Sequence, residues 1–449
     1  MSGLPEGWAW TTLGQITRDC DQRVPDANDE FRYVDIASVD RQSKAITAPQ
    51  TLLGKEAPSR ARKEIRHGDV LVSMTRPNLN AVAMVPEDLD RQIASTGFDV
   101  LRASEVDPRW VFNAVRSQDF VERMSSLVQG ALYPAVRSKD VRGYELPLAP
   151  LSEQKRIADK LDSVLARVDA CRDRLDRIPA LLKRFRQAVL AAATSGRLTE
   201  DWRVQEEVAT WDQSETLGSV GTVTGGLTKN AKRAEMPLQR QYLRVANVQT
   251  NQFDLDDVAM IGLTTAEFEK TRLQAGDLLI VEGNGSLDQI GRVALWKGQI
   301  VDCSHQNHLI RWRAGPRLLA PFALYFLLSP EGRRQIVDVA SSTTGLHTLS
   351  ISKVSRLRIP IPSLAEQHEI VRCVEALFAF ADRVEARCAA ARKQAGQLTP
   401  ALLAKAFRGE LVPQDPADEP AAELLKRLAA RRAEAPKARR GRKPVAAGE

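Results

Sequence analysis

Polar side chains that could read nucleic acid gather in two loops of the chain. Both loops follow a Gly-Asp-[Val/Leu]-Leu run, at residues 68–71 and 276–279, and together they carry Arg76, Asn78, Asn80, Asn284, Gln289 and Arg292. Arginine, asparagine and glutamine side chains match the donor and acceptor pattern of base edges in the DNA major groove. We therefore predict that both loops contact DNA, and the alternative is a pair of solvated surface loops.

Further polar residues extend these predicted contacts into neighbouring segments. They are Tyr133, Arg137, Lys229, Lys232, Arg233, Gln306, Asn307 and His347. The two lysines and the arginine that follow the glycine cluster at 221–226 suit phosphate better than bases. The whole chain has 64 Lys and Arg against 57 Asp and Glu, and this net charge of +7 favours an acidic partner such as nucleic acid.

Motifs of a catalytic centre are absent from the sequence, which has no phosphate-binding Gly-x4-Gly-Lys-Ser/Thr loop and no Asn/Asp-Pro-Pro-aromatic motif for methyl transfer to an amino group. Glu153-Gln154-Lys155 has the acid-x-lysine spacing of a nuclease, but it begins a predicted helix, and we interpret it as helix-cap chemistry. Residues 303–308 include metal-ligand types without a second cluster to complete a zinc site, so a polar or strand-turn role is favoured. We predict no catalytic residue and no bound metal.

The elements that must position the two loops repeat along the chain. Residues 147–198 align with residues 360–411 at a constant offset of 213, and fourteen of these 52 positions are identical. Chance would give roughly three to five identities in Ala-rich segments. We conclude that the chain is an internal duplication.

Each copy has apolar residues spaced by three and four, which is typical of a helix in a coiled coil. This seam includes Leu161, Val168, Leu175, Val374, Leu377 and Leu402. Helix starts are predicted at Ser152 and at the capping box Ser363–Glu366, and helix ends at Gly196 and Gly409. We expect the two helices to pair antiparallel.

Two further features complete the predicted organisation of the chain. Pro179 and Pro400 fall inside the helices, so one kink or break is predicted in each. The segment before each helix mixes short β-branched runs, turns and helices, and residues 10–14 resemble residues 211–218, which predicts two α+β domains. The tail from residue 412 is rich in Pro, Ala and charge and is predicted to be disordered; within it, residues 439–444 resemble an AT-hook, with a plain basic tail as the alternative.

The duplicated order of these motifs resembles the specificity subunit of type I restriction-modification systems. The resemblance rests on Pro-x3-Leu-x-Glu-Gln before each helix, on the Gly-Asp-[Val/Leu]-Leu run in each domain, and on the Gly-x-Leu helix endings, and it covers about residues 1–412. It implies target-recognition domains at 1–150 and 199–363 that alternate with helical repeats at 151–198 and 364–411, followed by the tail at 412–449. The fold would be α+β with pseudo-twofold internal symmetry.

The resemblance also implies the activity and the partners. The chain would be a non-catalytic subunit that recognises a bipartite target in double-stranded DNA, two half-sites around a nonspecific spacer. Two methyltransferase subunits would dock on the helices that carry the seam residues named above, and restriction or translocase subunits would join through them. S-adenosylmethionine, ATP and Mg would then be needed only in the partner subunits, and this chain would hold no cofactor.

Cysteine usage and hydropathy indicate the compartment. The five cysteines form no Cys-x-x-Cys pair, and the sequence has no secretory leader and no apolar run of roughly 18–20 residues, so we expect a soluble cytoplasmic protein without a membrane partner. A coiled-coil scaffold whose domains bind protein is a second hypothesis, which the Asn/Arg/Gln loops and the basic balance disfavour. A fused methyltransferase or nuclease is a third, and its motifs are missing.

Overall fold

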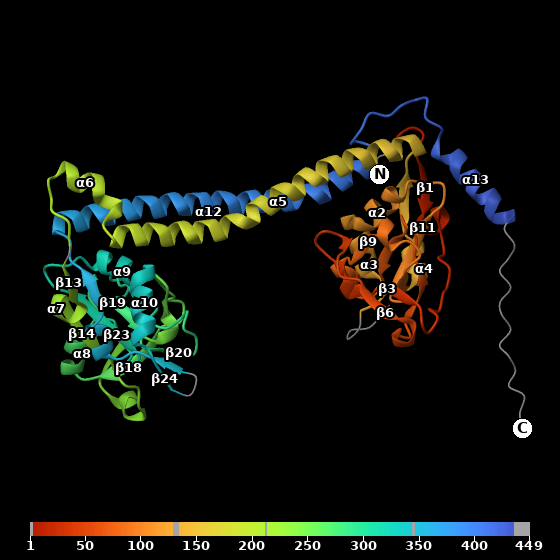
Figure 1. The fold of residues 1–449 in the computed structure, drawn as a ribbon. Helices are drawn as coiled ribbons and strands as arrows, with labels where there is room; N and C mark the ends of the chain where they lie inside the picture. Colours follow the sequence, from red (N-terminus) through yellow and green to blue (C-terminus); the bar gives the residue numbers. More distant parts are fainter. Residues whose placement is uncertain (1–2, 129–133, 212, 344–345, 435–449) are drawn as a thin grey trace, which may run out of the picture. The chain divides into compact units, whose positions relative to one another are not determined.

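The computed structural model describes residues 3–128, 134–211, 213–343 and 346–434. Two helices of 44 residues, α5 (Leu151–Thr194) and α12 (Leu364–Phe407), each follow a mixed α+β domain, and Figure 1 shows this alternation. The chain divides into unit 1, which is Met1–Leu175 with Ala391–Glu449, and unit 2, which is Asp176–Ala390. The unit boundary thus falls inside the helices, and each unit contains one domain and part of each helix.

Unit 1 is built on two four-stranded sheets and a two-stranded ribbon. The first sheet has the order β2 (Thr17–Arg18), β11 (Phe98–Ala103), β8 (Val70–Ser73), β9 (Val82–Met84), and the second has the order β6 (Gln50–Leu53), β3 (Glu30–Val34), β10 (Ile93–Ser95), β7 (Ala61–Glu64). The ribbon pairs β1 (Ala9–Thr12) with β12 (Glu145–Leu148), and a hairpin joins β4 (Val39–Asp40) to β5 (Ala45–Ile46). The helices besides α5 and α12 are α1 (Leu13–Ile16), α2 (Pro108–Arg116), α3 (Gln118–Ser126), α4 (Ser138–Arg142) and α13 (Ala421–Glu434).

Unit 2 repeats this plan. Its main sheet has the order β14 (Gly221–Gly225), β23 (Leu309–Ala314), β19 (Leu278–Val281), β21 (Val293–Leu295), and its second has the order β18 (Ala259–Leu263), β15 (Leu238–Leu243), β22 (Ser304–His305). The smaller pairings are β13 (Ser214–Thr216) with β26 (Arg358–Pro360), β16 (Val248–Gln249) with β17 (Gln252–Phe253), and β25 (Leu346–Thr348) with both β20 (Gly283–Asn284) and β24 (Ser341–Thr343). Its short helices are α6 (Glu200–Gln205), α7 (Leu217–Val220), α8 (Thr265–Thr271), α9 (Ala320–Leu328), α10 (Pro330–Val339) and α11 (Ile351–Ser355).

The strand register confirms the internal repeat. In unit 1 the parallel pair β3 and β10 sets Tyr33 opposite Ile93, and in unit 2 the parallel pair β15 and β22 sets Tyr242 opposite Ser304. The predicted α+β fold with a duplicated domain and helix is therefore confirmed.

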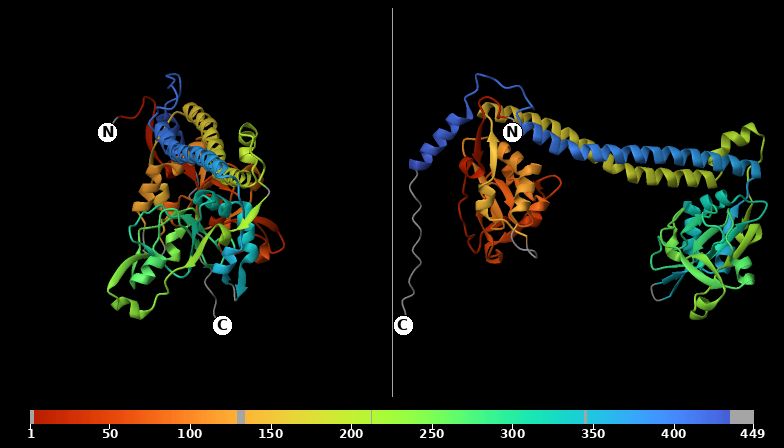
Figure 2. Two further views of the ribbon diagram at one scale, coloured as in Figure 1. Left: turned by 90° about the vertical axis from the view of Figure 1, so that its left-hand side faces the viewer. Right: turned by 180° about the vertical axis from the view of Figure 1, so that it is seen from behind.

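The helices α5 and α12 pair antiparallel, as predicted, and they lie side by side in both views of Figure 2. In unit 1, Arg172 donates a hydrogen bond of 2.9 Å to the carbonyl oxygen of Ala395. In unit 2, Arg186 donates to Asp382 and to Glu385, both at 2.7 Å. Residue numbers therefore rise along α5 while those of its partners fall along α12.

Neither internal proline ends its helix. Pro179 and Pro400 lie inside α5 and α12, and both are exposed. A proline on the exposed side of a helix gives up one hydrogen bond where water can replace it, while the packed seam holds the turns on either side. The predicted break is thus not seen, whereas the predicted glycine ends are confirmed, since Gly196 and Gly409 adopt φ values of +80° and +71°.

The seam residues proposed for partner docking are used inside the chain. Leu161, Val168 and Val374 are buried, and Leu175, Leu377 and Leu402 are partly buried. A side chain buried in its own core offers no surface to a second protein, so Leu161, Val168 and Val374 pack inside the chain. Partner docking at the three partly buried residues stays a prediction.

The repeated Glu-Gln pair fixes each domain to the start of its helix. Glu153 accepts a hydrogen bond of 3.0 Å from the indole nitrogen of Trp8, and Glu366 accepts one of 2.9 Å from that of Trp211. The carboxylates are buried and bind tryptophan, so helix capping describes them incompletely. The counterpart of Trp211 is therefore Trp8, whereas Trp10 lies exposed on β1.

The glutamine of the pair bridges backbone segments. Gln154 accepts from the backbone nitrogen of Asp107 and donates to the carbonyl oxygen of Ala149. Gln367 accepts from the backbone nitrogen of Leu319 and donates to the carbonyl oxygen of Pro362. Each glutamine thus joins the end of the preceding strand to the segment that begins α2 or α9.

The first part of the predicted tail is ordered. Helix α13 buries Ala421, Leu424 and Leu428 in the core of unit 1, and the backbone nitrogen of Ala421 donates to the carbonyl oxygen of Gly7 at 2.8 Å. The prediction of a disordered tail from residue 412 is therefore wrong as far as residue 434. The apolar spacing of three and four was sufficient for one short amphipathic helix despite the charged composition. The AT-hook-like residues 439–444 lie outside the described residues.

Candidate nucleic-acid interface

The first predicted loop forms one surface with a second predicted segment of unit 1. After β8 the chain turns through Arg76 and Asn80, which adopt left-handed φ values of 48° and 46° on either side of a short turn. The side chains of Arg76 and Asn78 are exposed, and the backbone nitrogen of Arg76 donates to the carbonyl oxygen of Pro134 at 2.8 Å. Left-handed conformations at non-glycine residues cost energy and cluster at functional sites. The loop and residues 134–137 thus lie together.

Unit 2 brings its predicted residues together in the same way. The short strands β20 and β25 pair antiparallel and set Asn284 opposite His347. The backbone nitrogen of Glu282, just before β20, donates to the carbonyl oxygen of His308 at 3.0 Å. Gln306 and Asn307 therefore lie next to this ribbon, although the sequence separates them from both of its strands.

The two surfaces share one arrangement of backbone hydrogen bonds, which we call the backbone frame. In unit 1 the nitrogen of Val136 donates to the oxygen of Met74 at 2.9 Å, and in unit 2 the nitrogen of Leu349 donates to the oxygen of Glu282 at 2.7 Å. Met74 and Glu282 each follow the buried strand by one residue, so two residues further on Arg76 and Asn284 occupy equivalent positions. The frame is the same and the side chains that it presents are different.

Two of the predicted contacts are instead engaged inside the protein. The Nδ2 group of Asn80 donates to the carbonyl oxygen of Val115 at 2.9 Å, and its Oδ1 accepts from Lys44 at 3.1 Å. Arg233 is buried, donates to the carbonyl oxygen of Gly262, and forms an ion pair of 2.8 Å with Glu267. This guanidinium holds the pKa of the Glu267 carboxyl down to about 2. Asn80 and Arg233 therefore support the loops from inside.

The other predicted residues remain at the surface or close to it. Arg137 is exposed at the start of α4, and its backbone nitrogen donates to the Asp140 side chain at 2.9 Å. Lys229, Lys232 and Gln289 are exposed, and Arg292 is partly buried. Tyr133 lies outside the described residues.

Lys44 was not predicted as part of this surface; it lies at the tip of the β4–β5 hairpin and reaches the first predicted loop. Its Nζ donates to the carbonyl oxygen of Asn80 at 2.5 Å. Burial, and then the nearby Arg116 guanidinium, lower the pKa of the Lys44 ammonium to about 8. The hairpin turn was recognisable in principle, but its contact with a loop 36 residues away was not.

The cysteine and histidine cluster of unit 2 belongs to the core. Cys303 and His305 are both buried, and Nδ1 of His305 lies 3.1 Å from the carbonyl oxygen of Thr271. Burial lowers the pKa of the His305 ring to about 4, so the ring is neutral near pH 7. Among the described residues, no group of three His, Cys, Asp or Glu side chains could hold a metal ion.

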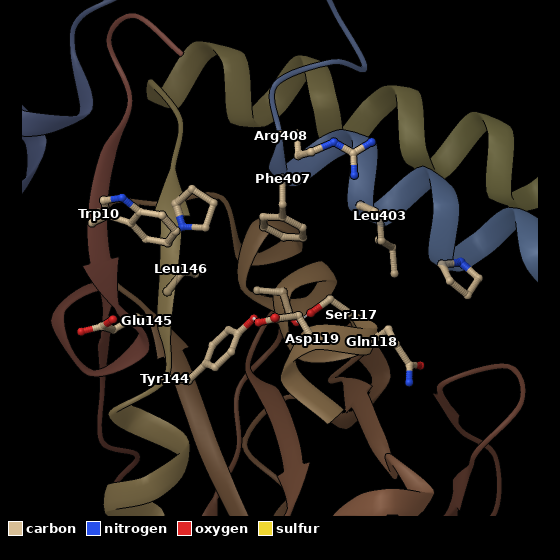
Figure 3. Close-up of a pocket in the computed structure, with 14 residues that line it drawn as sticks. Trp10, Ser117, Gln118, Asp119, Tyr144, Glu145, Leu146, Leu403, Phe407 and Arg408 are labelled. Atoms are coloured by element: carbon tan, nitrogen blue, oxygen red, sulfur yellow. Dashed lines mark hydrogen bonds between the residues drawn. The ribbon is translucent and has the colours of Figure 1, made fainter. Parts of the chain in front are cut away.

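Unit 1 contains an apolar groove, which Figure 3 shows with its lining residues. It has a volume of about 340 Å³, and its lining includes Trp10, Leu146, Leu403 and Phe407. Trp10 is 63% exposed. The hydroxyl of Ser117, also in the lining, donates to the carbonyl oxygen of Ala114 and caps α3, and no histidine or cysteine lines the groove within the described chain, so it does not form a nucleophile and base pair.

The sequence of this chain is similar to those of known proteins. Residues 210–388 match the family described as the type I restriction modification DNA specificity domain. The chain is 31% identical to the EcoKI specificity subunit of Escherichia coli (strain K12), and equally to the StySPI specificity subunit of Salmonella potsdam, over 96% of this chain and of each relative.

Solved structures agree in fold. The crystal structure of the HsdS subunit from Thermoanaerobacter tengcongensis matches with a TM-score of 0.65 and 27% identity over 91% of this chain and 98% of that one. A structure reported for complex assembly and conformational transition of the type I R-M system matches with a TM-score of 0.73 and 26% identity over 91% and 100%. Among the described residues, no helix is both long enough and apolar enough to span a membrane. The chain belongs to the family of type I restriction-modification specificity subunits, which recognise DNA sequence and carry no catalytic centre of their own.

Proposed function

We propose that the two units read the two half-sites of a bipartite DNA target, with a nonspecific spacer between them. The observation that carries this proposal is the shared backbone frame, which presents Arg76 in unit 1 and Asn284 at the equivalent place in unit 2. Arginine pairs best with guanine and asparagine with adenine in the major groove. The same frame with different side chains suits two half-sites of different sequence.

The proposed partners are two methyltransferase subunits and, through them, restriction or translocase subunits. S-adenosylmethionine, ATP and Mg would be bound by those partners. Because Leu161, Val168 and Val374 of the helix seam are buried, docking would use more exposed surfaces, and the Trp10 groove of unit 1 is one candidate. Pro147 and Pro360 are equivalent positions of the repeat. Trp10 lies opposite Pro147, and Ser214 lies opposite Pro360, so unit 2 has a serine at the position of Trp10.

The test is to express the chain with its methyltransferase and to map the methylated sites across a genome. We expect a motif of two short defined parts around an undefined spacer. Replacing residues 1–150 with the corresponding domain of a relative should change one part and leave the other. A contiguous motif, or a change in both parts, would contradict the proposal of two readers, and a complex without salt-dependent DNA binding would favour a protein-binding scaffold.

A further inference from the structure

A polar groove in unit 2 lies between helix α5 and residues 282–292, which follow β19 and which we call the reading loop of this unit. It has a volume of about 510 Å³. Its walls include Lys183 and Gln187 of α5, Thr250 of the β16–β17 hairpin, Gln289 and Arg292 of the loop, and Arg333 of α10. Helix and loop thus face the same space, which we call the α5 groove.

The charge of the α5 groove is unbalanced. Three cations line it against one carboxylate, that of Asp288. Among the described residues, the side chain of Lys183 makes no hydrogen bond and no ion pair. Arg186, one helical turn away on α5, is by contrast neutralised by Asp382 and Glu385. The exposed ammonium of Lys183 is therefore available to an anion from outside the chain.

The hydrogen-bonding groups of the Arg292 guanidinium are also incompletely paired. Its Nε is buried without a hydrogen-bond partner, and its terminal nitrogens have only long contacts, 3.4 Å to the Gln249 side chain and 3.5 Å to the carbonyl oxygen of Val245. Because these contacts are long and involve neutral acceptors, the terminal nitrogens of Arg292 can bind an anion that enters the groove. Arg333, in comparison, donates to the carbonyl oxygens of Ile290 and Leu287 and so fixes the loop that carries Gln289.

Cations also gather at the corresponding place in unit 1. Lys44 lies at the tip of the β4–β5 hairpin, as Thr250 lies at the tip of the β16–β17 hairpin. Arg116 ends α2 just as Leu328 ends α9, and burial, followed by the charge of Arg116, lowers the pKa of Lys44. Two neighbouring cations that repel each other favour an anion between them.

We propose that the α5 groove holds the phosphate backbone of the double-stranded DNA that unit 2 reads, and that Lys183 contacts a phosphate. This proposal rests on the proposed function. Arg292 would contribute a second charged donor, and Gln187 and Thr250 would contribute neutral donors of the kind that bind phosphate oxygens. Helix α5 is then part of the DNA-binding surface as well as of the helix pair.

The test measures DNA binding by the complex of this chain with its methyltransferase at increasing salt concentration. Neutralising one phosphate contributes about 0.9 to the slope of log K against log salt. Lys183→Gln should lower that slope by about 0.9, on target and non-target duplexes alike, while the methylated motif and the melting temperature stay unchanged. Lys183→Arg should restore the slope.

Arg184→Gln is the matched control, because Arg184 is exposed, adjacent in sequence and outside the groove lining. It removes the same charge from the same helix and should change the slope by much less. Equal slopes for Lys183→Gln and the unsubstituted complex, or equal losses in Lys183→Gln and Arg184→Gln, would overturn the groove proposal. A complex with no preference for its own methylated motif would instead overturn the proposed function.

Discussion

The glutamate of the repeated Glu-Gln pair should respond in opposite ways to the same substitution in the two units. Glu366 is fully buried, and one of its oxygens accepts hydrogen bonds from Trp211, from Thr199 at 2.6 Å and from Arg203 at 2.5 Å. Glu153 is equally buried but accepts only from Trp8, and in both glutamates the second oxygen has no hydrogen-bond partner among the described residues. Only Glu366 therefore belongs to a buried ion pair.

Removing one member of a buried ion pair leaves the other charge unpaired, which costs about 3–5 kcal/mol. Glu366→Gln strands the guanidinium of Arg203, whose side chain is 10% exposed, so we expect unit 2 to lose about 3 kcal/mol of unfolding free energy. Glu153→Gln keeps an acceptor for Trp8 and removes a buried charge, so we expect a change below about 1 kcal/mol or a gain in stability.

The pH dependence of stability gives the sign of the effect expected for Glu153→Gln. Burial raises the pKa of the Glu153 carboxyl above its usual value, although Trp8 and Arg156 oppose the shift. Folding then takes up a proton between the unfolded and the folded pKa, so this group makes unit 1 less stable as pH rises through that window. The advantage of Glu153→Gln should be largest at neutral pH and should disappear below the unfolded pKa of about 4.3.

Hydrogen exchange followed by mass spectrometry distinguishes the two units. Glu366→Gln should accelerate exchange at the start of α12 and in α6, while Glu153→Gln should leave exchange at the start of α5 unchanged or slower at pH 7. If Glu153→Gln destabilised unit 1 as strongly as Glu366→Gln destabilises unit 2, the ion pair between Glu366 and Arg203 would not be what sets the two glutamates apart.

Two further substitutions test the reading loop and the ordered tail. Arg76→Ala should weaken binding by about 1–3 kcal/mol at one base pair of the first half-site, measured on duplexes with single-base changes, and equal weakening on every duplex would make Arg76 a phosphate contact. Leu424→Ala should cost unit 1 about 2–5 kcal/mol in urea unfolding because this side chain is buried in its core, whereas the exposed Lys426→Ala should cost less than about 0.5 kcal/mol. Equal midpoints for these two variants would show that α13 is not part of the core.

The long helices could be predicted because their signals are local. Apolar spacing, Ser363 as a cap, and Gly196 and Gly409 as ends all act within a few residues of the boundaries that they define. The burial of α13 could not be weighed in the same way, because its contact with Gly7 joins opposite ends of the chain.

The candidate site was only partly predictable, because exposure depends on contacts that are distant in the sequence. The loops themselves follow from the Gly-Asp runs, but Asn80 is engaged by Val115 and Arg233 by Glu267, 35 and 34 residues away. Nothing near Asn80 or Arg233 in the sequence distinguishes them from exposed residues such as Asn78 and Lys232. Their partners had to be seen in the fold.

The way in which each frame is held explains how its side chains can differ without loss of the fold. The reading loops are positioned by backbone hydrogen bonds, such as Met74 to Gly97 in unit 1 and Glu282 to His308 in unit 2. A backbone bond is indifferent to the side chain that the residue carries, so Arg76 and Asn284 can occupy equivalent positions. The Glu-Gln pair acts through its side chains, and for that reason both copies keep it. Under the proposed function, specificity for DNA can therefore change within a constant scaffold.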